Sequence, residues 1–397
     1  MDLKTASRFA YHFFRCLGRL PAKHLLYLAR KMGSENPHMH SGKLWINTFF
    51  PPIPSPAFDR FMDSVLARAR TPYSAYFAVT SRCPHSCAHC SFAGRQAGEL
   101  PTADALEIIS QIDSLGCPVI GFTGGEPLLR KDLPELIEAA SKNASTVLFT
   151  TASGLTEPIA RKLKDAGLSS VMVGIESAEM AEHNRLRGRE NSFRQAFEGI
   201  KIAKQAGLYA AASTIAFREK IRSCEIEKIA RFCESLGAME LRILEPIPTG
   251  GVCGDDSIIL SSEESREMAD FQKRWNRRKT SLAVCSFSHL ESGEMFGCGA
   301  GYHHLFIDSA GNVCPCDLTP LSFGNALEKP LSEIWQEMEQ FFPLPRRGCF
   351  MKEAAKKGIL PAAGSALPAG PETSRNICRQ LPRRGRLPKV YENYLNR

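Results

Sequence analysis

The sequence contains no apolar run near the ~20 residues that a membrane-spanning helix requires. It also lacks a strong compositional bias. Of its 397 residues, 43% are hydrophobic and 23% are charged, which excludes disordered, collagen-like and coiled-coil chains. No secretory signal pattern is recognisable at its start. The net charge of +8 is small for this length, so we expect a globular, cytoplasmic protein with no specific nucleic-acid partner.

Cysteine, by contrast, is abundant. The 14 cysteines are spread over the whole chain, whereas disulfide-stabilised secreted domains are short and concentrate their cysteines. We therefore expect reduced thiols that bind metal.

The first 58 residues form a basic N-terminal extension that ends in a proline-rich connector from Leu44 to Phe58, where we predict no regular helix. Aromatic and aliphatic residues alternate with basic ones early in the extension, as in an amphipathic helix: Phe9, Phe13, Phe14, Leu17 and Leu20 with Arg8, Arg15, Arg19 and Lys23. Such a helix either packs against the rest of the protein or contacts a membrane surface peripherally. Further basic residues, Arg383, Arg384 and Arg386, mark a basic C-terminal tail.

Between residues 70 and 250, short apolar segments alternate with amphipathic ones. We predict strands at 76–79, 119–122, 146–150, 170–174, 209–215 and 240–244, and helices at 103–115, 133–141, 157–166, 193–206 and 225–236. Glycine follows four of these helices, at Gly116, Gly167, Gly207 and Gly237, as helix C-termini commonly require. Six β/α units in series predict an α/β fold with a parallel sheet curled into a partial barrel.

Three cysteines, Cys83, Cys87 and Cys90, follow the first predicted strand within eight residues. With His85 or His89 as a fourth ligand they would suit zinc. A 4Fe-4S cluster held by three thiolates would instead keep one iron open for another ligand. The loop lies at the C-terminal end of a barrel strand, where active sites of such barrels are found. Its CxxxCxxC spacing resembles that of the radical S-adenosylmethionine (SAM) superfamily.

The resemblance extends to the ends of the following strands and implies a SAM site. Gly124, Gly125, Glu126 and Pro127 are similar to the superfamily's GGEP motif, which holds the methionyl amino group of SAM. By the same resemblance, Ser153 and Glu176 are expected SAM contacts after the third and fourth strands. Arg187, in a stretch similar to HxxxRG, is expected to pair with the SAM carboxylate. The third strand lacks the usual Asn.

A second set of cysteines lies in residues 251–397, where the β/α periodicity weakens. Cys298, Gly311 and Cys316 resemble the opening of the SPASM and Twitch modules, which hold auxiliary iron–sulfur clusters. Residues 304–316 predict a β-hairpin with its turn at 309–312. The resemblance implies one auxiliary cluster held by Cys298, Cys316, Cys349 and Cys378, with Cys314 as a substitute, because the tight downstream series of a full SPASM module is missing.

The resemblance as a whole implies an enzyme that cleaves SAM reductively to a 5′-deoxyadenosyl radical and abstracts a hydrogen from a substrate. An electron donor such as flavodoxin or ferredoxin would supply the electron. The substrate stays open among peptides or proteins, cofactor precursors and lipids, and so does the choice between oxidoreductase and transferase. The alternative is a zinc-stabilised binding protein without radical chemistry.

Overall fold

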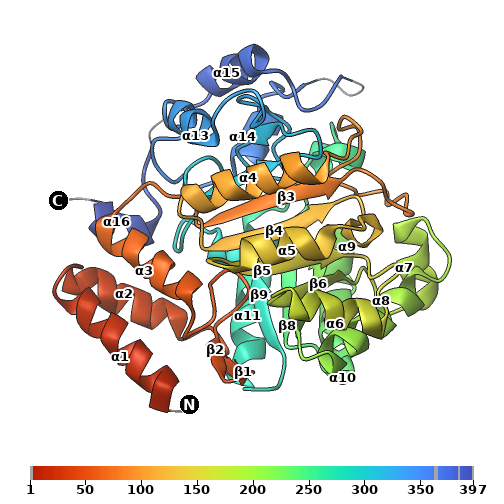
Figure 1. Cartoon of the computed structure of the whole chain (residues 1–397), viewed down its shortest axis with the longest axis horizontal. Coiled ribbons are helices and arrows are strands. Elements are labelled where there is room, and N and C mark those ends of the chain that lie inside the picture. Colours follow the sequence, from red (N-terminus) through yellow and green to blue (C-terminus); the bar gives the residue numbers. More distant parts are fainter. Residues whose placement is uncertain (1–2, 362–364, 383–384, 396–397) are drawn as a thin grey trace.

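The computed structural model describes residues 3–361, 365–382 and 385–395, so Arg383 and Arg384 lie outside the described residues. Its centre is a nine-stranded sheet in the order β11-β10-β3-β4-β5-β6-β7-β8-β9 (Figure 1). The six predicted strands are its middle: β3 (Ser74–Thr80), β4 (Val119–Gly124), β5 (Ser145–Thr150), β6 (Ser170–Gly174), β7 (Tyr209–Ile215) and β8 (Glu240–Leu244). They are parallel and consecutive, which confirms the predicted α/β partial barrel; the sheet does not close on itself within the described residues.

Helices connect these strands at the predicted places. They are α4 (Thr102–Ser114), α5 (Leu133–Ser141), α6 (Glu157–Asp165), α8 (Ser192–Gln205) and α10 (Glu225–Leu236), with the shorter α7 (Met180–Arg187) and α9 (Arg218–Arg222) between them. The four glycines predicted to follow helices all have positive φ, from 74° to 98°. Glycine adopts this conformation without the steric cost that a side chain would add.

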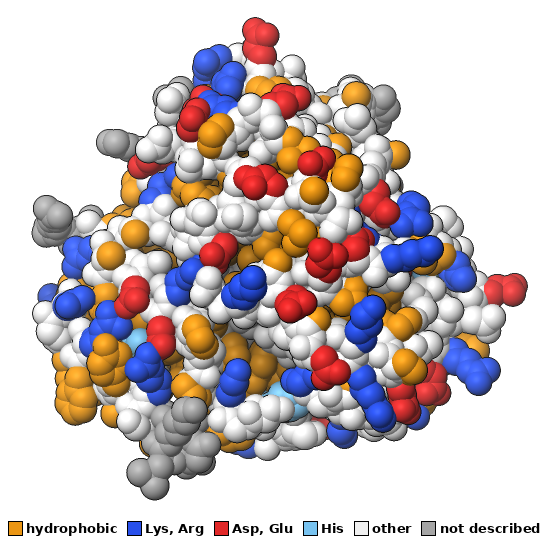
Figure 2. Space-filling model, in the orientation of Figure 1, with side chains coloured by type: hydrophobic (Ala, Val, Ile, Leu, Met, Phe, Trp, Pro, Cys, Tyr) orange, Lys and Arg blue, Asp and Glu red, His pale blue; other side chains and the backbone are white. Residues whose placement is uncertain are grey.

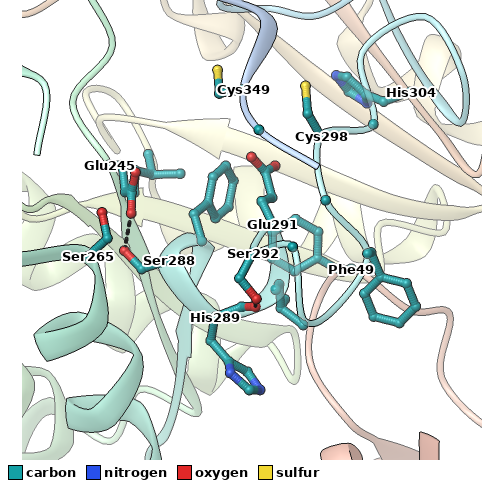
Figure 3. A pocket seen from close by; sticks show the side chains of 18 of the residues that line it. Phe49, Glu245, Ser265, Ser288, His289, Glu291, Ser292, Cys298, His304 and Cys349 are labelled. Carbon is teal, nitrogen blue, oxygen red and sulfur yellow. Dashed lines mark hydrogen bonds between the residues drawn. The ribbon is translucent and has the colours of Figure 1, made fainter. Parts of the chain in front are cut away.

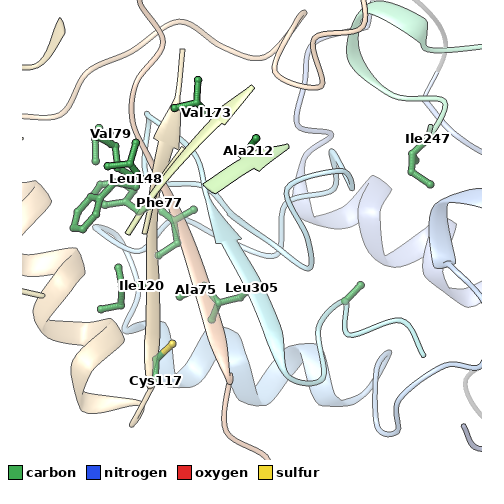
Figure 4. Packing of buried hydrophobic residues seen from close by; sticks show 14 of the residues in the cluster. Ala75, Phe77, Val79, Cys117, Ile120, Leu148, Val173, Ala212, Ile247 and Leu305 are labelled. Carbon is green, nitrogen blue, oxygen red and sulfur yellow. The ribbon is translucent and has the colours of Figure 1, made fainter. Parts of the chain in front are cut away.

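The main core lies between the sheet and its helices. Figure 4 shows Phe77, Ile120, Leu148 and Val173 on four neighbouring strands; all are fully buried. Because side chains alternate along a strand, the other face of the same strands carries a different set, including Tyr76 and Phe149, which line an interior cavity.

The sheet continues past residue 250, where we placed the end of the barrel domain. β9 (Ala283–Ser286) extends it in parallel beyond β8, after α11 (Ser262–Arg277). On the opposite side, β10 (His304–Ile307) pairs in parallel with β3, and β11 (Val313–Cys314) pairs antiparallel with β10. The predicted hairpin is thereby confirmed, and it belongs to the central sheet.

The N-terminal extension forms a corner of the molecule (Figure 1). It comprises α1 (Leu3–Leu17), α2 (Ala22–Met32), the hairpin β1 (His38–His40) with β2 (Lys43–Trp45), and α3 (Pro56–Ala67). Our prediction of no helix up to Phe58 was wrong by one turn, because α3 begins at Pro56. Proline is tolerated in a first turn, and the Ser55 side chain accepts the Phe58 N–H at 3.0 Å.

The remaining elements complete the C-terminal region: α12 (Phe287–Leu290), α13 (Leu331–Glu339), α14 (Phe350–Lys356), α15 (Pro371–Arg379) and α16 (Lys389–Leu395). Short 3₁₀ turns occur at Pro127–Leu129, Gly250–Val252 and Asp256–Ile258. Tyr391 and Tyr394 of α16 are buried in a cluster with Leu20 and Leu66, so the two ends of the chain pack together. Within the described residues of the chain, no helix is both long and apolar enough to span a bilayer.

Candidate functional site

The cysteine loop leaves the end of β3 and carries its thiols near the surface. Cys83 is exposed, while Cys87 and Cys90 are half-buried. Burial of its thiol raises the pKa of Cys83 to about 11, and burial also raises the pKa of Cys87. A bound cation would therefore be needed to hold these groups as thiolates at neutral pH.

The Gly124-Gly125 turn at the end of β4 packs directly against this loop. The Gly125 N–H donates to the Thr80 carbonyl at 2.8 Å, and the Glu126 N–H donates to the Arg82 carbonyl at 2.8 Å. A Cβ on either glycine would lie 2.2 Å from one of these two carbonyl oxygens. The glycines are thus required for the close approach of the two loops.

A second glycine pair, which the sequence analysis missed, supports the other end of the loop. The Gly251 N–H donates to the Cys90 carbonyl at 2.9 Å. A Cβ on Gly250 would lie 2.1 Å from that same oxygen. The available signal was that Gly250 and Gly251 follow the sixth strand much as Gly124 and Gly125 end the second.

Glu126 is fully buried and points to the end of β5. Its carboxylate accepts hydrogen bonds from the Thr150 hydroxyl at 2.6 Å and from the Thr151 N–H at 2.8 Å. Burial raises its pKa, although these hydrogen bonds oppose the rise. Pro127 opens the following 3₁₀ turn, and Ser153 is buried in the turn after β5. The residues predicted for one half of the SAM site therefore lie at adjacent strand ends.

Glu176, after β6, is the centre of a buried network of charges. His89 Nε2 lies 3.3 Å from one carboxylate oxygen, Arg187 donates to the same oxygen at 3.0 Å, and Lys220 donates to the other at 3.0 Å. Burial alone would raise the pKa of Glu176, but its interactions with His89, Lys220 and Arg187 hold it well below its usual range. The sequence analysis did not identify His89 or Lys220 in this role.

Arg187 connects this network to the cysteine loop. It ends α7, and its guanidinium passes over the backbone of β6, where a Cβ on Gly174 would lie 1.7 Å from Nη2. Nη1 lies 3.7 Å from Cys87 Sγ. The expected site residues Cys87, Glu176 and Arg187 are thus brought together, with Arg187 and Glu176 paired to each other.

Among the described residues, one group of three side chains could hold a metal ion with its ligand atoms within 4.8 Å of one another: His304, Cys316 and Asp317.

A cavity of about 1550 Å³ extends from the strand ends to the C-terminal cysteines. Thr123, Phe149 and Ser213 of β4, β5 and β7 line it on the barrel side. Cys298, Cys316 and Cys349 line it on the other; Figure 3 shows Cys298 and Cys349 near the Glu291 carboxylate, with His304 beyond. The cavity therefore extends from the inner face of the sheet to the C-terminal cysteines, and the loop from Cys83 to Cys90 is not among the described residues that line it.

Three of the four predicted auxiliary ligands thus share one wall. Cys298 lies close enough to Cys349 for their side chains to hydrogen bond, and this contact, followed by burial, raises the pKa of Cys349 well above its usual value. Cys316 Sγ lies 3.2 Å from Asp317 Oδ1, which is 3.4 Å from His304 Nε2. Sequence reasoning missed the last two residues.

The structure does not place Cys378 in this wall. Cys378 lies on α15 with 3% of its surface exposed, within the main hydrophobic core. Cys314, the proposed substitute, is fully buried on β11, where the Arg95 guanidinium donates to its sulfur at 3.6 Å. Neither is among the described residues that line the cavity.

The cavity wall is strongly basic. Ten Lys and Arg residues line it against four Asp and Glu residues. Two of the four carboxylates are paired within the wall: Glu245 with Lys352, and Glu294 with Lys31, Arg347 and Lys389. Aromatic side chains, including Phe49, Phe149 and Phe287, supply apolar surface between the charges.

Comparison with known proteins identifies the class. Residues 77–233 match the radical SAM superfamily, and residues 298–350 match the SPASM iron–sulfur cluster-binding domain. The chain therefore belongs to the radical SAM superfamily. It is an enzyme of the branch that carries a SPASM domain, and its cofactors are a 4Fe-4S cluster, SAM and auxiliary iron–sulfur. A zinc-stabilised binding protein is not supported.

The similar proteins include AdoMet-dependent heme synthases. The chain is 28% identical to that of Methanosarcina barkeri over 303 residues, which cover 70% of this chain and 86% of the relative. It is also 28% identical to that of Nitratidesulfovibrio vulgaris over 289 residues, which cover 66% and 78%.

Solved structures share the fold. Streptococcus suis SuiB bound to its precursor peptide SuiA has a TM-score of 0.56 at 17% identity, over 70% of this chain and 68% of that one. Native anSMEcpe with bound AdoMet has a TM-score of 0.54 at 16% identity, over 67% and 80%. At such identities the likeness concerns the fold alone.

Proposed function

We propose that this enzyme uses its radical chemistry on an anionic organic molecule, of the cofactor-precursor class, bound in the cavity between the barrel and the C-terminal cysteines. The observation that carries the proposal is the continuous cavity of about 1550 Å³, which extends from the inner face of the sheet, at Thr123 and Ser213, to the C-terminal cysteines. When bound, a 4Fe-4S cluster and SAM supply a 5′-deoxyadenosyl radical that removes hydrogen from carbon. The protein positions the substrate and excludes water.

We assign the ligands of the cluster and the contacts of SAM to particular residues of this chain. Cys83, Cys87 and Cys90 hold the cluster, and the turn from Gly124 to Pro127 binds SAM beside it together with Ser153. Arg187 and Glu176 form the opposite side of this site, where Lys220 and His89 keep the carboxylate ionised. An external one-electron donor, a flavodoxin or ferredoxin, reduces the cluster. The exposure of Cys83 at the surface supports access for such a donor.

At the far end of the cavity we assign Cys298, Cys316 and Cys349 to the auxiliary cluster. Their shared position in the cavity wall supports this set, and Cys378, buried in the same hydrophobic cluster as Cys298, stays the fourth ligand expected from sequence. Asp317 Oδ1, 3.2 Å from the Cys316 sulfur, accepts a hydrogen bond from that thiol and is an oxygen ligand available beside it.

The character of the cavity supports the substrate class. An excess of six positive residues favours an anion, since ten Lys and Arg face four Asp and Glu, and the aromatic side chains favour an apolar body. Heme, which the similar synthases are named for making, is a flat apolar ring that carries carboxylates. The similarity therefore supports a cofactor precursor over the peptides and simple lipids that the sequence left open.

The radical chemistry is tested with anaerobically reconstituted protein, SAM and dithionite. We expect the wild type to bind iron and sulfide and to form 5′-deoxyadenosine. The triple variant C83A/C87A/C90A should lose all cleavage, while it retains the iron of the auxiliary site. The matched control is C224A, which removes an exposed thiol that belongs to neither set of predicted ligands. Normal cleavage by the triple variant would contradict the assignment.

The substrate class is tested with a tetrapyrrole that carries free carboxylates and with its methyl ester, followed by quenching of tryptophan fluorescence. We expect the free acid to bind at least tenfold more tightly, because the ester removes the charge but not the ring. Equal affinity for the two compounds would contradict an anionic substrate and would leave the radical chemistry untouched.

A further inference from the structure

Helix α1 has one face attached to the protein. Arg8 and His12 both pair with Asp59 of α3, the latter at 2.8 Å, and Arg15 donates to Asp63 at 2.7 Å. Cys16 is buried behind them. These contacts fix the orientation of α1, so the opposite face points away from the protein.

That opposite face is apolar and exposed. We define the α1–α2 apolar patch as Phe9, Phe13, Phe14, Leu17 and Leu26, whose exposed fractions are 48%, 49%, 69%, 53% and 74%. Together with Tyr11, it accounts for six of the eleven exposed large hydrophobic residues in the described chain. Figure 2 shows hydrophobic side chains gathered over this corner, with Lys and Arg side chains around them. Scattered exposed hydrophobics are ordinary, but a concentration of this kind marks an interaction surface.

The basic residues beside the patch have no acidic neighbours within their own segment of the chain. Arg19 lies between the two helices, and Lys23 and Arg30 lie on α2; all three are exposed, and no Asp or Glu occurs between residues 3 and 34. The carboxylates of α3 that approach α1, Asp59 and Asp63, are paired with Arg8, His12 and Arg15. A protein partner usually offers a mixture of charges, whereas the surface of an anionic bilayer offers only negative ones. Amphipathic helices with aromatic residues on one side and basic residues around them are typical of the bilayer interface.

We propose that the α1–α2 apolar patch docks on an anionic phospholipid bilayer, with Phe9, Phe13, Phe14, Leu17 and Leu26 in the interface and the flanking basic residues against the headgroups. Neither cluster is involved in this contact, so it stands apart from the radical chemistry.

One consequence rests on the proposed function. Leu26 belongs to the patch, whereas Tyr27, Arg30 and Lys31 of the same helix line the cavity. The docked surface and the cavity thus share α2. The arrangement suits an anionic, amphiphilic substrate that partitions into the bilayer.

The test is flotation of the intact protein with vesicles of phosphatidylcholine alone and with phosphatidylglycerol added. We expect binding to the anionic vesicles, weaker by at least tenfold without phosphatidylglycerol. The variant F9S/F14S/L17S should lose binding at least tenfold. The variant R19E/K23E should lose more than this. Neutralising one basic residue weakens binding to anionic vesicles by roughly fivefold, and each of these substitutions also reverses the sign of the charge. Formation of 5′-deoxyadenosine, measured in parallel without vesicles, should be unchanged in both variants and shows that they fold.

The matched control is I159S/L327S, which removes two exposed hydrophobic residues elsewhere and should float like the wild type. The proposal is overturned if the wild type does not float, or if F9S/F14S/L17S floats equally well. It is also overturned if the wild type is a dimer in solution and that variant is a monomer, since the patch then covers a second copy. None of these results bears on SAM cleavage, so failure here is separate from failure of the proposed function.

Discussion

Single residues around the site carry charges that water does not reach, and each is compensated by its neighbours. Arg242, 2% exposed on β8, donates to the Tyr76 hydroxyl at 3.2 Å, and its guanidinium lies 4.0 Å from the centre of the Phe49 ring. Glu240 Oε1, two residues earlier on the same strand, lies 3.8 Å from Arg242 Nε. Burying a charge costs free energy unless the charge is paired, and Arg242 is therefore buried together with polar partners inside the barrel.

Glu35 gives a testable consequence of such burial. Its carboxylate accepts from Asn47 at 3.2 Å and from Gln272 at 2.8 Å, yet burial, with a further contribution from Glu240, raises its pKa to about 7. The unfolded chain would ionise it near 4.5. The folded state therefore holds the proton more tightly, and its stability falls as the pH rises from about 4.5 through about 7, by about 3 kcal/mol.

We expect Glu35→Gln to remove this dependence, so that the difference in unfolding free energy between wild type and variant changes by about 3 kcal/mol between pH 5 and pH 8. Urea unfolding at several pH values measures it. Glu157→Gln, which removes an exposed carboxylate on α6, is the control. A constant difference between wild type and Glu35→Gln across this range would refute the assigned pKa. Cys285 and the Lys279 amine, 3.3 Å from the Glu35 carbonyl, also face this site.

At the scale of elements, the sequence predicted the regular portion of the molecule well. All six strands and five helices between residues 70 and 250 form within two residues of their expected ends, because burial on both faces and glycine-terminated helices leave strong local signals. The cysteine loop and the Gly124-Gly125 turn were likewise predictable, since each is a short motif at the end of one strand.

Contacts between distant elements could not be predicted. His89 comes from the cysteine loop, Glu176 from the turn after β6 and Lys220 from α9, and no local pattern shows that they meet. Cys298 and Cys378 both belong to the main hydrophobic core cluster, which the sequence pattern around each of them does not show. The pairing of β10 with β3 joins residues more than 200 positions apart, and it depends on the closing geometry of the sheet rather than on either strand.

The turn after β8 provides a prediction at this scale. Gly250 has φ of 58°, and a Cβ there would lie 2.1 Å from the Cys90 carbonyl oxygen. We expect Gly250→Ala to displace Cys90, with loss of most SAM cleavage and of the iron bound by the loop. Iron analysis and 5′-deoxyadenosine formation measure both effects.

Gly254→Ala is a matched control for Gly250→Ala. Gly254 has φ of 85°, so alanine there carries a similar backbone strain of about 1–2 kcal/mol, but its Cβ would meet no atom within 4 Å. It should lose some stability and keep both iron and activity. If the two variants behave alike, strain alone explains the loss and the loop contact is unimportant.

At the scale of the whole molecule, the central sheet joins the barrel and the cysteine-bearing C-terminal region into a single folding unit. β10 covers the edge of β3, whose residues Ala75, Phe77 and Val79 are at most 1% exposed. An exposed, apolar edge strand pairs readily with other chains. A chain that ends at residue 297 should therefore aggregate, as sedimentation of the expressed protein will show.

A chain that ends at residue 382 keeps β10, β11 and the three cavity cysteines, but it loses α16, with its packing against the N-terminal helices and the cavity-lining residues Lys389 and Tyr391. We expect it to stay in the supernatant and to bind iron. A monomeric, folded product from the chain that ends at 297 would show instead that the barrel is an independent domain.

The position of β10 in the sequence also determines how long one edge of β3 stays unpaired while the chain is synthesised. β3 is complete at Thr80, whereas its partner β10 begins at His304, so 224 residues must be added before the two can pair. At ~5–20 residues per second this takes about 11–45 s, far longer than a strand needs to find a neighbour. Throughout that interval the nascent chain exposes an unpaired hydrophobic edge on the ribosome. Its yield in a cell should therefore depend on how quickly residues 81–307 are translated and on chaperones that shield β3 until then.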